Sequence, residues 1–152
     1  MPKLSSAASS DRAPHTAGVA RTVLGVLHGL RAAWRTPAVI ASSLATQLAP
    51  APASSAASHP RDARFAVLVA HLALGRLARV RPARWRATCL YRSVAESLTL
   101  RALGFPAHVV IGVGSGAEPI EVIAHAWVEC EGVQCLSPRG AAELEAFATR
   151  RA

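Results

Sequence analysis

Cysteines, metal-binding patterns and aromatic side chains are all scarce in this chain of 152 residues. Its 3 cysteines are too few for the disulfide framework of a small secreted domain. Cys130 and Cys135 can face each other across a hairpin, but a reduced pair is the simpler expectation. None of the 6 histidines stands at a ligand spacing from a pair of cysteines, so the sequence predicts no metal site and no cofactor. Aromatic residues make up 5% of the chain, so aliphatic side chains and alanine must fill the core.

Long apolar runs are absent as well. Residues 17–34 are interrupted by Arg21, His28 and Arg31, which makes them poor material for a bilayer span. Residues 37–53 share some features with a signal-peptide core, but they start too late and are too polar for one. We therefore expect a cytoplasmic protein without a membrane span.

Acidic residues are fewer than basic ones. The formal net charge is +8, from 17 Lys+Arg and 9 Asp+Glu, and Lys3 is the only lysine. This charge fits a surface that attracts nucleic acid or an acidic partner, and it also fits arginines that merely solvate helix faces. The arginines are spread along the chain, and no base-stacking aromatic pattern accompanies them. Both observations favour the second interpretation and argue against nucleic-acid binding.

The chain has the length of one domain, and its 51% of hydrophobic residues excludes a wholly disordered polypeptide. Residues 1–15 are small and polar, and no fixed structure is expected there. Residues 17–34 predict an amphipathic helix, and a weaker second helix is expected over residues 37–48. The apolar stripe expected on the first helix consists of Val19, Val23, Val26, Leu27 and Leu30.

A stretch rich in proline, alanine and serine, residues 49–60, predicts a linker. It is the best boundary between two parts of the chain. Residues 1–60 would form a partly disordered or helical N-terminal extension, and residues 61–152 the main domain.

Two helices open the main domain. The first is expected over residues 62–79, with Asp62 as its N-cap. The second is expected over residues 89–103, between an N-cap at Thr88 and a stop at Gly104. The apolar stripe expected on the first of them consists of Phe65, Leu68, Val69, Leu72, Leu77 and Val80.

After Gly104 the hydrophobic pattern changes its period. Residues 107–113 are rich in β-branched side chains, residues 123–130 alternate, and residues 133–136 follow a turn, so three short strands are predicted. Residues 141–150 predict a closing helix. Helices followed by an antiparallel run of strands indicate an α+β fold.

Two residues carry candidate chemistry. Cys89 would occupy the first turn of its helix, where unpaired backbone N–H groups and the helix dipole favour a nucleophilic thiolate. A cysteine in such a place is also often only a small buried hydrophobe. His125 lies in an otherwise apolar strand between Ala124 and Ala126, whose small side chains leave room beside its ring. A thiolate with an imidazole base in hydrogen-bond reach suits acyl transfer, whereas a hydrogen-bonded core histidine is the alternative.

A family resemblance is carried by two segments, ATCLYRSVAESLTLRALGFPAHVVIGV and IAHAWVEC. They resemble the leader peptidases of lasso-peptide biosynthesis, members of the transglutaminase-like superfamily. The shared blocks are a Cys-Leu-x-Arg-Ser helix start, Gly-hydrophobic-Pro-Ala, a strand ending in Ile-Gly-Val, and His-Ala-Trp-Val-Glu. The resemblance covers residues 64–137 and implies a transglutaminase-like (papain-like) cysteine peptidase core, with N-terminal helices before a small antiparallel sheet.

By this resemblance Cys89 is the nucleophile and His125 the general base of an endopeptidase. Its implied substrate is a ribosomally made precursor peptide, cut at the leader–core junction. An asparagine-synthetase-like macrolactam cyclase then joins the freed amine to an Asp or Glu side chain. Residues 1–60 show no strand run of the kind that a fused recognition domain needs, so a separate leader-recognition protein is the other implied partner.

The match on the remaining family positions is mixed. Trp127 and Glu129 match the family's strand, and Trp127 is expected to be a core aromatic. Arg92 and Ser93 match the nucleophile helix, where a structural task is expected. The family's third catalytic residue, an Asp about a dozen residues after the histidine, is absent. By counting, Ser137 takes its place as a candidate third member, and Leu136 does so if one residue is missing.

The absent carboxylate keeps other functions open. A catalytically weak or inactive scaffold could bridge precursor, recognition protein and cyclase. An amide-forming transglutaminase would keep the fold and transfer the acyl group to an amine instead of to water.

Overall fold

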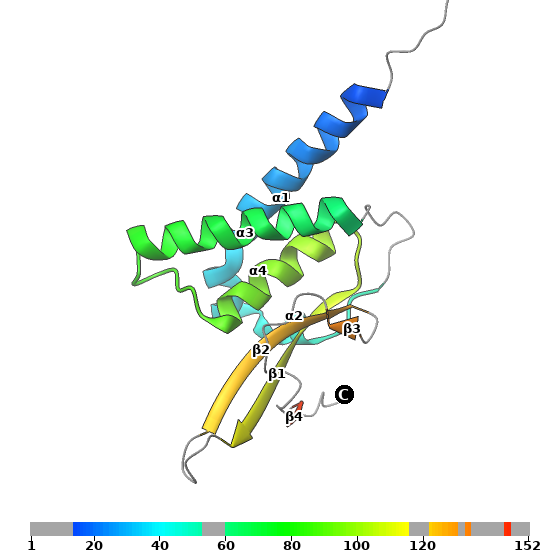
Figure 1. The fold of residues 1–152 in the computed structure, drawn as a ribbon. Helices are drawn as coiled ribbons and strands as arrows, with labels where there is room; N and C mark the ends of the chain where they lie inside the picture. The colour runs from blue at the N-terminus through cyan, green and yellow to red at the C-terminus, as the bar shows by residue number, and fades with distance from the viewer. Residues whose placement is uncertain (1–13, 53–59, 116–121, 131–132, 135–144, 147–152) are drawn as a thin grey trace, which may run out of the picture.

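The computed structural model places the helices before the strands in the chain, and the helices pack on one face of the sheet (Figure 1). Helix α4 lies between α3 and the sheet, and all neighbouring strands are antiparallel, in the order β3-β2-β1-β4. This is the predicted α+β architecture. The structure describes residues 14–52, 60–115, 122–130, 133–134 and 145–146. The helices are α1 (Pro14–Ser42), α2 (Leu44–Leu48), α3 (Pro60–Val80) and α4 (Cys89–Ala102), and the strands are β1 (Ala107–Ser115), β2 (Val122–Cys130), β3 (Val133–Gln134) and β4 (Glu145–Ala146).

The sequence predicted that the first helix ends before Pro37. Helix α1 instead continues through Pro37 to Ser42. A proline inside a helix has no N–H for the carbonyl four residues earlier, which here belongs to Ala33. The indole Nε1–H of Trp85 donates to that carbonyl at 3.2 Å. The helix therefore tolerates Pro37 because a buried tryptophan from another segment satisfies the acceptor that the proline leaves unpaired.

The apolar stripe expected on α1 is not the face that the helix buries. Helix α1 packs on α3 through small residues: a Cβ added to Gly29 would lie 2.5 Å from the carbonyl oxygen of Ala66 and 3.0 Å from the amide of Ala70. Only glycine permits this close approach of the two backbones. The large side chains consequently point outward, and Val19, Val23, Leu27 and Leu30 are 46–66% exposed.

Helix α3 likewise exposes large apolar side chains and buries mostly small ones. It begins at Pro60, so Asp62 lies in the first turn instead of capping the helix. Phe65, Leu68 and Leu72 of the expected apolar stripe are exposed. The buried residues of α3 are Ala63, Ala66, Val67, Ala70 and Leu74.

The core is shared by segments on both sides of residue 60. Val39 of α1 packs in one cluster with Val94 of α4 and Val109 of β1. Gln47 of α2 accepts a hydrogen bond from Ser97 of α4 at 3.3 Å. Helices α1 and α2 thus belong to the same packed body as α3, α4 and the sheet, while residues 53–59 of the predicted linker lie outside the described residues.

Helix α4 ends as predicted. Gly104 has a positive φ of 88°, the left-handed conformation that glycine adopts without strain. Its N–H donates to the carbonyl of Arg101, and the N–H of Phe105 donates to that of Leu100, each at 3.0 Å. These are the two bonds of a Schellman motif, and Phe105 packs against the cluster that holds Leu100.

Two residues of a predicted helix form a short strand instead. Glu145 and Ala146 lie within the helix expected over residues 141–150, but they pair with Val113 and Gly112 at the edge of β1. Pairing satisfies backbone groups that an open strand edge would leave exposed, and this tertiary contact outweighs local helix propensity. The flanking residues of that prediction lie outside the described part of the chain.

Candidate active site

Cys89 is the first residue of α4, as the sequence predicted, and Thr88 is the N-cap. The carbonyl of Thr88 accepts the first helical hydrogen bond, from the N–H of Arg92 at 3.1 Å, but its side chain makes no capping bond. The first-turn N–H groups therefore keep the ability to bind a negative charge. The thiol is half-buried, against the cluster that includes Val94 and Ala126.

His125 lies in the middle of β2, directly opposite Gly112 of β1. A glycine partner has no side chain, so the ring has space on the side of the neighbouring strand. The imidazole stacks nearly parallel to the indole of Trp127, with ring centroids 6.4 Å apart and an angle of 18°. The two rings therefore lie on the same face of the sheet, as residues two apart in a strand must.

The Nε2 atom of His125 is buried and has no hydrogen-bond partner. A buried polar atom without a partner costs on the order of 1–3 kcal/mol, so most native proteins avoid it. In the resting structure Nε2 therefore lacks the bond expected of a hydrogen-bonded core histidine. The nitrogen is available to a group that arrives later.

One hydrogen bond ties the two candidate residues' elements together. Ser93, one helical turn after Cys89, donates from Oγ to the carbonyl of Ala126, the residue after His125, at 2.8 Å. Residues four apart share a helix face, so Cys89 lies on the face of α4 that contacts β2. Ser93 is buried, and its bond is structural, as expected from the sequence.

Cys89 and His125, both described by the structure, are not joined by a hydrogen bond. The alternation of β2 explains this: Ala126 and Val128 pack toward the helices, whereas His125 projects with Trp127 from the other face. The structure therefore brings the two residues to adjacent elements and leaves the imidazole turned away from α4.

Trp127 is a core aromatic, as expected. It is 6% exposed, packs on Val110, and donates from Nε1 to Oε1 of Glu129 at 2.9 Å. The other oxygen of Glu129 lies 3.9 Å from Nε2 of His108. Glu129 is thus engaged at the far end of the strand. The candidate third member, Ser137, lies outside the described residues, as do Leu136 and Cys135.

Two residues that hold this arrangement were not recognised in the sequence. Trp85, in a segment that reads as a basic connector, is fully buried. Arg101 donates to the carbonyls of Ala107 at 2.6 Å, Thr46 at 2.9 Å, Gln47 at 3.3 Å and Ala49 at 2.6 Å. It joins α4 to α2 and to the start of β1, and its place in the last turn of α4 was the only sequence signal.

Within the described ranges, no group of three histidine, cysteine, aspartate or glutamate residues is arranged to hold a metal ion. No helix in the same part of the chain is long and apolar enough to span a bilayer.

Comparison with known proteins agrees with this fold. No curated protein and no solved structure matches the chain. Residues 23–150, which include α1 from Val23 onward, α2, α3, α4 and the sheet, match a family model described as "Transglutaminase-like superfamily". The match covers most of the chain, including Cys89 and His125. The chain belongs to the transglutaminase-like superfamily.

Proposed function

We propose that this chain is a cysteine endopeptidase that removes the leader from a ribosomally made lasso-peptide precursor. The superfamily includes cysteine peptidases and transglutaminases, and its members generally depend on a cysteine for catalysis. The observation that carries the proposal is the bond from Ser93 to Ala126, which fixes the N-terminal end of the Cys89 helix against the strand of His125.

In the proposed reaction the Cys89 thiolate attacks the carbonyl carbon of the leader's last residue. The protonated imidazole of His125 gives its proton to the leaving amine, which becomes the N-terminus of the core peptide. Cys89 is then bound to the leader as a thioester. A water molecule, deprotonated by His125, attacks the thioester carbonyl. Collapse of the intermediate releases the leader, whose new carboxyl group loses its proton to solvent, and restores the Cys89 thiolate and the protonated imidazole.

The uncapped start of α4 supports the first step. Thr88 makes no side-chain capping bond, so first-turn N–H groups remain for the thiolate or for the developing oxyanion. Both proton transfers by His125 require its ring to reach the Cys89 side of β2. In the resting structure the side chain projects from the opposite face of the strand, so the proposal requires a local shift of the β2 backbone and not a rotation of the ring alone. Catalytic hydrogen bonds are commonly absent or long before substrate binds and tighten in the complex.

The implied partners and location remain part of this proposal. They are the precursor peptide, a separate leader-recognition protein and an asparagine-synthetase-like macrolactam cyclase, all cytoplasmic. We expect the recognition protein to stimulate cleavage strongly, because the described residues before α3 belong to the same packed body as the Cys89 helix.

Two alternatives have specific support. The absent family Asp and the unbonded Cys89–His125 pair favour an inactive scaffold that only bridges the partners. The family assignment itself also fits an amide-forming transglutaminase.

Mass spectrometry of a precursor incubated with the protein and the recognition protein distinguishes the peptidase, the transglutaminase and the inactive scaffold. Hydrolysis gives two fragments whose summed mass exceeds that of the precursor by one water. Amide formation on a glutamine side chain releases ammonia and gives one cross-linked product. The scaffold yields neither product, and that result would refute the peptidase assignment.

A further inference from the structure

The outer face of α1, defined by Val19, Val23, Leu24, Leu27, Leu30 and Trp34, is apolar and open to solvent. These six side chains are 46–66% exposed. The opposite face of the helix is buried through Gly25, Gly29, Ala32 and Ala33. Large hydrophobic residues on the outside and small ones on the inside invert the usual distribution, and an exposed apolar stripe of this length marks an interaction site.

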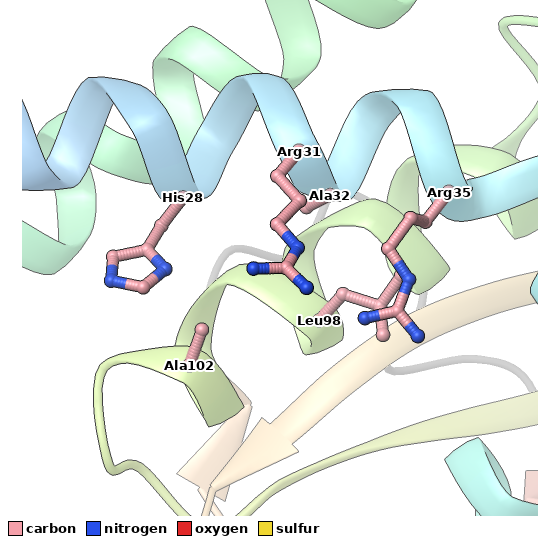
Figure 2. Close-up of a pocket in the computed structure, with 6 residues that line it drawn as sticks. All are labelled: His28, Arg31, Ala32, Arg35, Leu98 and Ala102. Carbon is pink, nitrogen blue, oxygen red and sulfur yellow. The ribbon is translucent and has the colours of Figure 1, made fainter.

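A basic pocket adjoins this outer face. It has a volume of about 220 Å³ and is lined by His28, Arg31, Ala32 and Arg35 of α1 and by Leu98 and Ala102 of α4. The imidazole and both guanidinium groups project into the same space above α4 (Figure 2). Arg31 and Arg35 form no ion pair with any residue that the structure describes. Two guanidinium groups one helical turn apart repel each other, and an anion between them would relieve that repulsion.

The stripe and the pocket run parallel along the helix. Val23, Leu27, Leu30 and Trp34 follow one another at spacings of four, three and four residues, which is the repeat that packs against a second helix. Arg31 and Arg35 continue the row that begins at Leu27, one turn apart, and so flank the stripe on one side. A single helical partner can contact both at once.

The charge of the helical layer indicates the sign of the partner. From Pro14 to Ala102 the only acidic residues are Asp62 and Glu96, and Glu96 is buried. A second copy meeting this face with the same face would bring arginines together. The two guanidinium groups line a hollow between α1 and α4, which suits a carboxylate on a protruding side chain better than the flat surface of a bilayer. An acidic side chain on a protein helix can enter that hollow and pair with the guanidinium fork.

We infer that the outer face of α1 and its basic pocket form a docking surface for an acidic amphipathic helix of a partner protein. The partner's apolar side chains lie along the stripe from Val23 to Trp34. Its carboxylates, one turn apart, occupy the pocket between Arg31 and Arg35. From Val19 to Trp34 the stripe is about 22 Å long, which matches about four turns of a partner helix. The inference stands apart from the proposed peptidase activity.

A designed helical peptide tests the surface. The probe has about 16 residues, with leucines at the spacing of the stripe and flanking glutamates, and its twin carries lysine in place of every glutamate. Binding is followed by fluorescence anisotropy at low and at physiological salt. We expect the full chain to bind the acidic peptide at least about tenfold more tightly than the basic twin.

Matched variants separate this surface from general attraction to a basic protein. The double variant Arg31→Glu with Arg35→Glu should weaken binding of the acidic peptide at least about tenfold and should strengthen binding of the basic twin. Leu27→Asn with Leu30→Asn should weaken binding of the acidic peptide by a similar factor. Arg64→Glu is the control: Arg64 is exposed on α3, two positions from the α1 contact at Ala66 and therefore on another face, and should change binding less than about twofold.

All of the substituted side chains are exposed, so unchanged circular dichroism will show an intact fold. Absence of peptide binding, or an equal effect of Arg64→Glu, would overturn the inference. So would binding to phosphatidylglycerol vesicles, without peptide binding, that is lost in the Arg31/Arg35 variant, because the ligand would then be a membrane. A concentration-dependent dimer abolished by Leu27→Asn with Leu30→Asn would assign the face to a second copy instead.

Discussion

The indole N–H of Trp85 donates to the carbonyl of Ala33, the one acceptor in α1 that Pro37 leaves without a helical donor. Two residues about fifty positions apart thus make one joint. This hydrogen bond allows α1 to continue past Pro37, and the continued helix places Val39 in the core beneath α4.

Replacing Trp85 by Phe should lower the free energy of unfolding by about 1–2 kcal/mol, because a buried carbonyl loses its donor. Urea denaturation measures the change. Trp34→Phe, at a half-exposed ring 5.1 Å from the Trp85 ring, is the control and should cost less than about 0.5 kcal/mol. Pro37→Ala restores an N–H to Ala33 and should reduce the cost of Trp85→Phe. If Trp85→Phe lowers the free energy of unfolding equally in the wild type and in Pro37→Ala, then Trp85 stabilises the fold by packing alone and not through this hydrogen bond.

Cys89→Ala should abolish leader cleavage and leave the thermal unfolding temperature nearly unchanged. The variant removes the proposed nucleophile from the start of α4 while keeping a good helix former. Cys130→Ala, also half-buried but near the end of β2, should keep activity. Cleavage by Cys89→Ala above about a hundredth of the wild-type rate contradicts covalent catalysis by this residue.

Ser93→Ala should reduce kcat about tenfold or more and leave KM little changed. Without its bond to Ala126, the start of α4 is no longer fixed against β2, and small displacements between reacting groups cost large factors in rate. Ser97→Ala is the matched control, because Ser97 is equally buried in α4 but bonds to Gln47 of α2. Equal kinetic losses in the two variants would reduce Ser93 to a general stabilising residue.

Ser137→Ala should lower kcat/KM less than about tenfold, or about 1.4 kcal/mol. A cysteine enzyme can hold its thiolate and imidazolium as an ion pair and depends less on a carboxylate than a serine enzyme does. Ser137→Asp restores the family's carboxylate and should preserve or raise activity. A loss beyond about a hundredfold in Ser137→Ala would make the hydroxyl an essential third member. Activity gained only in Ser137→Asp, from an inactive wild type, would favour the scaffold.

The stability of the fold should fall as the pH is lowered through 6.5, in part because of His71. Burial lowers the pKa of His71 below its ordinary value of 6.5, and the positive charge of Arg92 lowers it further. A backbone hydrogen bond at Arg92 and the Glu96 carboxylate, 3.5 Å from Nε2, favour the protonated ring but do not offset the effect of burial. The unfolded chain therefore binds the proton more readily than the folded one, so stability is retained above 6.5 and lost below it. His71→Gln should flatten this dependence in urea denaturation between pH 7 and 5. An unchanged slope would remove His71 as its cause.

The elements that the sequence predicted well are those with local signals. Thr88 and Gly104 predicted the first and last residues of α4 to within one residue, because N-caps and left-handed glycines act within one turn of the chain. Strands β1 and β2 followed from β-branched residues and alternation.

The errors arise where distant contacts decide. The stripes of Val23, Leu27, Phe65 and Leu72 have the spacing of core residues, but the close contact at Gly29 turns them outward. Periodicity identifies an apolar face and does not state whether this chain or another covers it. In the same way, the sequence indicated Cys89 and His125 as candidate catalytic residues. It did not indicate the face of β2 from which the imidazole projects, because that depends on how the strand packs.

The four carbonyls bound by Arg101 have a consequence for how the site responds to its surroundings. Burial lowers the pKa of this guanidinium, yet arginine stays protonated throughout the range in which thiols and imidazoles titrate. The joint between α4, α2 and the first residue of β1 therefore carries the same charge in acid, at neutrality and under oxidising or reducing conditions. The hydrogen bonds that hold the C-terminal end of the Cys89 helix against α2 and β1 are therefore independent of pH in this range.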